Sequence, residues 1–296
     1  MMLTVASTTG PFLRSPFTRI WAPAFSRCIA TAVATSAPFA GYSIKTEGQT
    51  LTDKCRVFFT AEPSGKVISP WHDIPLWTRP TENWKAMGMH CNYVAEISRG
   101  TRAKMEVATK EAHNPIRQDT RKGKLRFYGK DPCFNYGLLP QTWEDPSIQD
   151  PETKLFGDRD PMDLVELSEK PLPTGTVTEV KVLGCFCLLD QGEVDWKVLA
   201  IDTDNAWSKR LDSLADVDAY MPGRVEEIME WFCTYKMLEG KPRNQIGYGG
   251  KALSLEKARE IVVAAHEHWK SLLKSGGDDD GDYWLPESVQ TNKSGF

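Results

Sequence analysis

A chain of 296 residues is long enough for one large domain or two small ones, and it can bury a sizeable core without disulfide bonds. Its residues are 41% hydrophobic and 26% charged, which is typical of a globular protein and argues against wholesale disorder. An excess of acids, 40 Asp and Glu against 36 Lys and Arg, argues against a nucleic-acid backbone as the main partner and favours metal cations.

Residues 1–45 are rich in Ser, Thr, Ala and Pro, and the first acid of the chain is Glu47. Arg14, Arg19 and Arg27 are spaced through this stretch. The composition predicts an organellar transit peptide that is removed from the mature protein; a disordered N-terminal tail is the alternative. It does not separate a plastid from a mitochondrial destination. Arg14 and Arg19 interrupt any apolar stretch, which argues against a secretory signal.

The first two thirds of the folded part, from about residue 55 to 205, are dominated by alternation of apolar and polar residues. β-branched and aromatic residues alternate with polar ones, which predicts strands separated by turns such as Gln191-Gly192. The predicted strands lie around residues 56–59, 93–97, 103–107, 124–128, 177–189 and 194–201.

Helical spacing appears only in the last third of the chain. Val225, Ile228 and Phe232 follow a Pro-Gly pair, and a second apolar stripe extends from Ala258 to Leu272 after Ser254, a predicted N-cap. Strands first and helices last predict an α+β fold, with helices packed around a barrel. We expect one domain over residues 46–275. Residues 276–296 then form a solvated tail, in which a calcium loop at GGDDDGD is the less favoured alternative.

The cysteine pattern and the hydropathy of the chain predict the redox state of its compartment and whether it contains a membrane-spanning helix. The seven cysteines include no CxxC pair; Cys185 and Cys187 would point to one face of a strand, and no second Cys or His pair completes a zinc site. Scattered cysteines predict reduced thiols in an intracellular compartment. No run of about 18 apolar residues occurs, so we expect no membrane-spanning helix.

An acidic loop at residues 157–163, GDRDPMD, places three carboxylates within six residues. Full ionisation of three neighbouring carboxylates is unfavourable, because their negative charges repel one another unless cations lie between them. Mg²⁺ takes oxygen ligands and needs one or two carboxylates for each ion. Asp190 and Asp195 add two more at the ends of the predicted hairpin. An ordinary acidic surface turn remains the alternative.

Charged residues alternate on four of the predicted strands. Lys104 and Glu106, Lys124 and Arg126, and Asp195 and Lys197 are each two residues apart, and Glu96 alternates with apolar neighbours. For any single strand, a solvated sheet face is the default interpretation. Lys104, Arg126, Lys197 and the pair Tyr235-Lys236 could together bind an oxyanion. Carboxylates for metals and cations for phosphate are the groups that metal-assisted phosphoryl transfer to water requires.

Several motifs, in order along the chain, resemble the soluble family I inorganic pyrophosphatases. They are QDTRKGKLRF at 118–127, NYGLLPQTWEDP at 135–146, GDRDPMD at 157–163, DQGEVDWKVLAID at 190–202 and WFCTYK at 231–236. The resemblance extends from about residue 50 to 274. It implies a five-stranded OB-like β-barrel with surrounding helices, which hydrolyses pyrophosphate to two phosphates with several Mg²⁺ ions and so pulls biosynthetic reactions forward. It leaves open whether the protein is a monomer or a homodimer.

The resemblance also implies a role for each matching residue. Asp158, Asp163 and Asp195 match ligands of the activating metal, and Glu106, Asp190 and Asp195 match acids for metals that arrive with substrate. Asp160 matches the carboxylate that orients and deprotonates the attacking water. The phosphate-binding positions are matched by Lys104, Arg126, Tyr235 and Lys236. Tyr136 matches an active-site tyrosine, Lys197 and Glu96 match supporting residues, and Lys241 matches a position without a clear role.

Within the family, AKMEVAT at 103–109 and the short link from Arg126 to Asn135 are most similar to the plastid branch of plants and algae. The resemblance therefore favours the plastid stroma, with the mitochondrion as the alternative. Two positions depart from the family pattern. Ser98 replaces a common proline with little expected effect, and Arg159 replaces a smaller residue. An extended loop would turn Arg159 away from the metals, whereas an inward Arg159 would compete with them.

Three rival functions remain. The first is a broader phosphohydrolase acting on nucleotides. The second is a non-catalytic OB-type binder of oligonucleotides, which would need a basic groove with exposed aromatics; residues 47–296 instead hold 32 cations and 40 acids, a net charge of −8. The third is an inactive family member, for which Arg159 is the one hint.

Overall fold

The computed structural model describes residues 41–278 and 283–287. Most of the expected transit peptide therefore lies outside the described residues. The first strand, β1 (Tyr42–Glu47), already begins before the expected domain boundary at residue 45. It pairs with β2, and the hydroxyl of Tyr42 donates to the carbonyl of Val177. This side-chain bond to a distant strand explains why the folded domain starts earlier than local patterning indicated.

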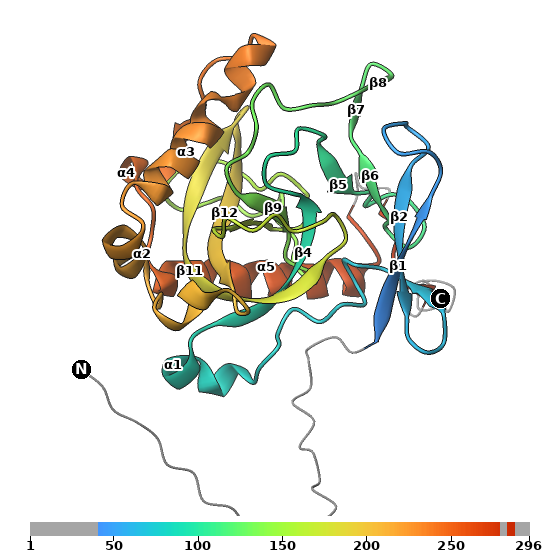
Figure 1. Cartoon of the computed structure of the whole chain (residues 1–296), viewed down its shortest axis with the longest axis horizontal. Helices are drawn as coiled ribbons and strands as arrows, with labels where there is room; N and C mark the ends of the chain where they lie inside the picture. Colours follow the sequence, from blue (N-terminus) through green and yellow to red (C-terminus); the bar gives the residue numbers. More distant parts are fainter. Residues whose placement is uncertain (1–40, 279–282, 288–296) are drawn as a thin grey trace, which may run out of the picture. The chain divides into compact units, whose positions relative to one another are not determined.

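The larger sheet forms the centre of the domain (Figure 1). Its strands pair in the order β12-β10-β9-β4-β11-β13, and β11 also pairs with β12. Each of β4, β9, β10, β11 and β12 therefore has two neighbours within this group. Their bounds are His90–Ile97 for β4, Asn135–Leu138 for β9, Asp163–Glu166 for β10, Val177–Asp190 for β11, Glu193–Asp202 for β12 and Gln245–Ile246 for β13.

A second sheet lies at the side of the first, and Lys104, one cation of the site described below, directly precedes its strand β5. Its order is β1-β2-β6-β5, with β3 paired to β2. The short strands β7 and β8 form a separate two-stranded ribbon. The bounds of these strands are Arg56–Ala61 for β2, Lys66–Ile68 for β3, Met105–Val107 for β5, Ile116–Gln118 for β6, Thr120–Arg121 for β7 and Lys124–Leu125 for β8.

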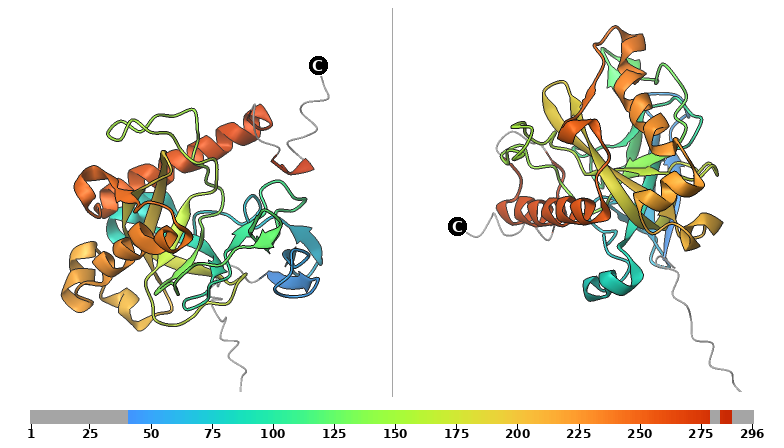
Figure 2. Two further views of the ribbon diagram at one scale, coloured as in Figure 1. Left: turned by 90° about the horizontal axis from the view of Figure 1, so that it is seen from above. Right: turned by 90° about the vertical axis from the view of Figure 1, so that its left-hand side faces the viewer.

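Helices cover the central strands from two directions, as the views in Figure 2 show. Alternate residues along the strands face different cores: Val198 packs with α5, whereas its neighbour Leu199 packs with α2 and α3. The helices are α1 (Trp84–Met87), α2 (Leu214–Tyr220), α3 (Arg224–Thr234), α4 (Gly247–Gly250) and α5 (Leu255–Ser275), and short 3₁₀ turns occur at Thr81–Asn83, Ala206–Lys209 and Tyr235–Glu239. The period-two strands and the two apolar helical stripes thus agree with the prediction of an α+β fold.

The strands predicted at 103–107 and 124–128 are shorter than expected. Only 105–107 and 124–125 are strand, and Ala103 pairs with Phe127 as an isolated bridge. The carbonyl of Arg126 accepts from the amide of Lys104 and also from the side chain of Gln118. Because the Gln118 side chain takes part in this pairing, the segment does not continue as a regular ladder.

The prediction of a solvated C-terminal tail is wrong for its described part. Leu285 is only 4% exposed, and the amide of Trp284 donates to the carbonyl of Thr109 at 2.9 Å. Residues 283–285 have apolar side chains, and burial of their apolar surface stabilises the packing of this segment against the domain. The acidic run before it is described only up to Asp278.

Cysteine and membrane expectations can be compared with the structure. Cys185 and Cys187 lie on the same face of β11, as expected, and the six described cysteines are free thiols. Within residues 41–278 and 283–287, no helix combines the length and the apolar character that a bilayer-spanning segment needs.

Candidate active site

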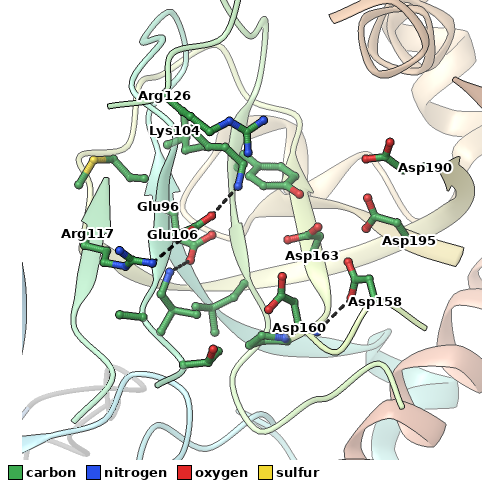
Figure 3. A pocket seen from close by; sticks show the side chains of 18 of the residues that line it. Glu96, Lys104, Glu106, Arg117, Arg126, Asp158, Asp160, Asp163, Asp190 and Asp195 are labelled. Atoms are coloured by element: carbon green, nitrogen blue, oxygen red, sulfur yellow. Dashed lines mark hydrogen bonds and ion pairs between the residues drawn. The ribbon is translucent and has the colours of Figure 1, made fainter. Parts of the chain in front are cut away.

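A cavity of about 380 Å³ opens between the central sheet and the second sheet. In Figure 3 the aspartates lie along one side of it and Lys104 and Arg126 lie across from them. The cavity is lined by thirteen of the residues predicted from the sequence: Glu96, Lys104, Glu106, Arg126, Tyr136, Asp158, Asp160, Asp163, Asp190, Asp195, Lys197, Tyr235 and Lys236. Lys241, which matched a family position without a clear role, is not among its lining residues.

Strand pairing brings three of the aspartates together. β10 and β12 are parallel and place Asp163 opposite Lys197, while Asp195 lies two residues earlier on the same face of β12. Asp190 ends β11 at a two-residue hairpin in which Gln191 and Gly192 have φ of 54° and 97°. Positive φ at both central residues is the geometry that a tight hairpin prefers. The Gln191-Gly192 turn predicted from the sequence therefore fixes where Asp190 stands relative to Asp195.

Lys197 is the buried cation among these carboxylates. Its side chain is 2% exposed and donates to Asp163, to Asp195 and, at 3.0 Å, to the hydroxyl of Tyr136. Burial acts to lower the pKa of Lys197, but Asp163 and Asp195 outweigh this effect and hold the pKa well above its usual value. Lys197 is therefore charged and compensates part of the negative charge of the aspartates.

The opposite wall presents two of the candidate phosphate-binding cations, Lys104 and Arg126. Arg126 pairs with Asp119 at 2.6 Å, and Lys104 lies 3.3 Å from the same carboxylate. Asp119 lies in the motif at 118–127, but the sequence alone predicts no role for it. Although burial acts to raise its pKa, Lys104 and Arg126 lower it, so Asp119 stays ionised and holds both cations toward the cavity. Lys236 pairs with Asp190, and the ring of Tyr235 stacks on Trp231 at 4.9 Å.

Comparisons with known proteins agree with this arrangement. The family described as inorganic pyrophosphatase matches residues 93–270. The chain belongs to the inorganic pyrophosphatase family. It is 43% identical to the inorganic pyrophosphatase of Eremothecium gossypii over 255 residues, which cover 84% of this chain and 85% of that protein.

Two further relatives show how broad the similarity is. Soluble inorganic pyrophosphatase 6, chloroplastic, of Arabidopsis thaliana is 42% identical, with 79% of this chain and 76% of that protein covered. A crystal structure of type I inorganic pyrophosphatase from Toxoplasma gondii matches with a TM-score of 0.74 at 40% identity, covering 78% of this chain and 99% of that one. Fungal and chloroplastic relatives match at nearly equal identity, so identity does not separate the branches of the family.

Glu144 is a residue of this pyrophosphatase site that sequence reasoning missed. One of its carboxylate oxygens accepts from the amide of Trp196 at 3.0 Å, and its side chain is buried. Carboxylate oxygens of Glu144, Asp158 and Asp195 lie within 4.8 Å of one another. Glu144 stands in the quoted WEDP motif, but no alternation marks it as part of the site. Glu144 is recognised as part of the site only from the tertiary contact between the loop at 142–146 and β12.

The donor set of the pyrophosphatase fits a hard divalent cation. All its candidate ligands are carboxylate oxygens, which Mg²⁺ prefers. Among the described residues, Glu144 Oε2 and Asp190 Oδ1 are buried without a hydrogen-bond partner. Buried polar atoms of this kind are costly unless a partner satisfies them. Asp158, Asp163, Asp195, Asp190 and Glu106, with Glu144 nearby, are therefore the residues that could hold metal ions in the pyrophosphatase.

Crowding and burial make these carboxylates hard to ionise in the absence of cations. Burial, followed by the charge of Asp160, raises the pKa of Asp158 to about 8. Asp160 is more exposed, because it opens to the cavity, yet desolvation by the cavity walls and the charge of Glu106 raise its pKa to about 7. Burial also raises the pKa of Asp195 and of Glu144 well above the usual range. The pyrophosphatase site therefore favours either protons or metal cations.

Glu96 and Arg159 lie at the edges of the site, where each contacts the segments around the cavity. Glu96 is 4% exposed and accepts from the amide of Val107 at 2.6 Å, which ties β4 to β5 behind the cavity. Arg159 is not in an extended loop, as the favourable alternative supposed, but in a left-handed turn with φ of 76°. Its guanidinium nevertheless leaves the cavity and pairs with Asp278 at 3.0 Å. In this pyrophosphatase it does not compete with a metal ion.

Proposed function

We propose that this inorganic diphosphatase hydrolyses pyrophosphate by Mg²⁺-assisted attack of water in the cavity between the two sheets. The observation that carries the proposal is the convergence of five aspartates, from the 157–163 loop and the hairpin between β11 and β12, on one cavity whose other wall presents Lys104 and Arg126. Bound Mg²⁺ would neutralise charge on the substrate and make the attacking water more acidic. Several ions for each active site are in keeping with the number of carboxylates.

Each of the thirteen predicted residues that line the cavity receives a role in this proposal. Asp158, Asp163 and Asp195 would hold the activating metal, and Glu106, Asp190 and Asp195 would serve the metals that accompany substrate. Asp160 orients the water and accepts its proton, and it is more exposed to the cavity than Asp158 or Asp163. The substrate oxygens bind Lys104, Arg126, Tyr235 and Lys236, which stabilise the charge on the departing phosphate. Tyr136, Lys197 and Glu96 support this arrangement.

The decisive experiment is a phosphate-release assay on the purified chain, with pyrophosphate and ATP as separate substrates. We expect rapid release from pyrophosphate with Mg²⁺, little without it, and little from ATP under either condition. Equal turnover of ATP would support the nucleotide phosphohydrolase instead. No turnover of pyrophosphate with Mg²⁺ would support the inactive family member.

Replacement of Arg126 by Lys should reduce kcat/KM roughly 10- to 100-fold. Lysine keeps the positive charge but loses the two-pronged donor geometry, and a hydrogen bond to a charged group contributes about 1.5–3 kcal/mol. The measurement is steady-state pyrophosphate hydrolysis at saturating Mg²⁺. Arg102→Lys is the matched control, because Arg102 pairs with Asp131 outside the cavity and is half exposed. Similar kinetics for both variants would contradict phosphate binding by Arg126.

Mg²⁺ should stabilise the protein more at about pH 8 than at about pH 5. The pKa values of Asp158 and Asp160 are raised to about 8 and about 7, so the metal-free folded state binds more protons there than the unfolded state does. These groups therefore lower stability as pH rises from about 4 through 8. Mg²⁺ competes with those protons, so its effect on the melting temperature grows over the same window. Thermal unfolding with and without Mg²⁺ tests this; an equal shift at both pH values contradicts it.

Fold detail, assembly and location extend the proposal. The ring of pairings among β4, β9, β10, β11 and β12 supports an OB-like barrel, in a domain that begins with β1 at Tyr42 rather than at residue 46. The protein would be a monomer or a homodimer, which light scattering after gel filtration distinguishes.

The acid-free N-terminus and the chloroplastic Arabidopsis relative support a transit peptide and the plastid stroma, with the mitochondrion as the alternative. A fluorescent fusion of residues 1–45 tests the destination.

A further inference from the structure

Arg159 separates the two carboxylates on which the proposed chemistry depends most. Asp158 is a candidate metal ligand and Asp160 is the candidate base, and both side chains reach the cavity from this turn (Figure 3). The amide of Asp160 donates to Asp158 Oδ1 at 3.0 Å, so the two residues share one tight turn. Whatever fixes the backbone of Arg159 therefore fixes the spacing of both carboxylates.

The backbone of Arg159 adopts a conformation that the residue does not favour. Its φ is 76°, in the left-handed region that residues with a Cβ seldom occupy. Such a conformation persists only when surrounding contacts hold it in place. One contact comes from the neighbouring loop, because the amide of Arg159 donates to the carbonyl of Glu144 at 3.1 Å.

The remaining contacts come largely from beyond α5. The carbonyl of Arg159 accepts two hydrogen bonds, from the hydroxyl of Tyr283 at 2.9 Å and from the indole nitrogen of Trp143 at 3.0 Å. Its guanidinium pairs with Asp278 at 3.0 Å. Trp143 Nε1 also lies 3.2 Å from the hydroxyl of Tyr283. Two residues from the C-terminal end thus bind the one residue that joins Asp158 to Asp160.

The segment that supplies Tyr283 is itself anchored to the domain. Trp284 donates its amide to the carbonyl of Thr109 at 2.9 Å, and its carbonyl lies 3.2 Å from a ring nitrogen of His72. The ring of Tyr283 packs edge-on against Trp71 at 5.6 Å, and Leu285 is buried. This anchoring needs only the rings and the backbone. The Tyr283 hydroxyl is not required for it, and that hydroxyl is directed at Arg159.

We propose that Tyr283 and Asp278 are positioning residues of the active site, which hold the turn at Arg159 so that Asp158 and Asp160 are spaced for metal binding. The inference rests on the proposed function, because it concerns the same metal ions. Neither residue touches substrate, since neither lines the cavity. Arg159, the departure from the family pattern, then has a use in this chain: it gives Asp278 a partner.

The test is direct titration of Mg²⁺ into the full-length protein by calorimetry, without substrate. Tyr283→Phe removes the hydroxyl and keeps the ring, and Asp278→Asn removes the charge at nearly constant shape. We expect each change to weaken Mg²⁺ binding about 3- to 10-fold, as the loss of one hydrogen bond or ion pair predicts. Asp278→Glu should retain part of the affinity. Tyr220→Phe is the control, because Tyr220 is an exposed tyrosine on α2.

Kinetics and unfolding separate positioning from general stability. For Tyr283→Phe, we expect the Mg²⁺ concentration for half-maximal activity to rise in step with the dissociation constant, while the urea midpoint of the metal-free protein changes little. Normal Mg²⁺ binding by both variants overturns the inference and leaves the proposed function intact. A fall in stability that accounts for the whole loss of binding also overturns it. Absence of Mg²⁺ binding by the unmodified protein overturns the metal assignment, and the inference with it.

Discussion

Replacement of Asp160 by Asn should lower kcat for pyrophosphate hydrolysis by about 10²- to 10⁴-fold, the usual contribution of a general base. Asparagine has nearly the same size, and the backbone amide that donates to Asp158 is unchanged. It cannot accept a proton from water at neutral pH. Mg²⁺ affinity, measured by calorimetry, should stay close to that of the unmodified protein or improve, because one of several crowded negative charges is removed.

Two further variants make the Asp160 result specific. Asp158→Asn removes a candidate metal ligand from the same turn, so it should weaken Mg²⁺ binding as well as turnover. Asp218→Asn changes an exposed aspartate on α2 and should alter neither. If Asp160→Asn lost metal affinity and activity in the same proportion as Asp158→Asn, Asp160 would be a ligand and another group would have to act as the base.

Replacement of Lys197 by Met should destabilise the metal-free protein by about 3–5 kcal/mol. The ammonium group is almost fully buried and donates to Asp163 and Asp195. Its removal leaves two carboxylates without their cation, and breaking a buried pair from one side has a cost of this size. Methionine keeps an unbranched side chain, so loss of packing contributes little. Urea unfolding without metal measures the change.

Conditions that neutralise the two carboxylates should reduce the Lys197→Met defect. Protonation supplies one route, so the variant should lose less stability at about pH 5 than at about pH 8. Mg²⁺ supplies the other, and saturating metal should recover part of the loss. Lys209→Met, on an exposed 3₁₀ turn, is the control. A defect that is independent of both pH and Mg²⁺ would show that Lys197 acts through packing alone.

The predicted site residues share a local signal. Lys104 and Glu106, like Asp195 and Lys197, are two apart on strands, and three aspartates fall in one seven-residue loop. Alternation determines which face a strand residue occupies. These local patterns, together with the family motifs, were sufficient to name all the acids and cations that line the cavity except Lys110, Glu111 and Arg117. Glu144 and Asp119, which were also missed, contact lining residues without lining the cavity themselves.

The residues that were missed depend on contacts distant in the sequence. Glu144 belongs to the site because its loop meets β12, and Asp119 because it reaches both Lys104 and Arg126. The two C-terminal contacts to Arg159 connect positions more than 100 residues apart. Composition led to the opposite expectation there, because an acidic run with glycines is typical of a solvated tail.

The sequence by itself determined the class of fold, the enzyme family and most of the charged residues that line the cavity. Periodicity and side-chain type are local properties, readable wherever a strand or helix has one buried face. The tertiary structure alone decided which faces meet. The parallel pairing that sets Asp163 opposite Lys197, the burial that raises the pKa values of Asp158 and Asp160, and the return of Tyr283 to Arg159 all arise from contacts between distant segments. No local sequence pattern predicts these contacts, because they form, and contribute to stability, only after distant segments of the chain have come together.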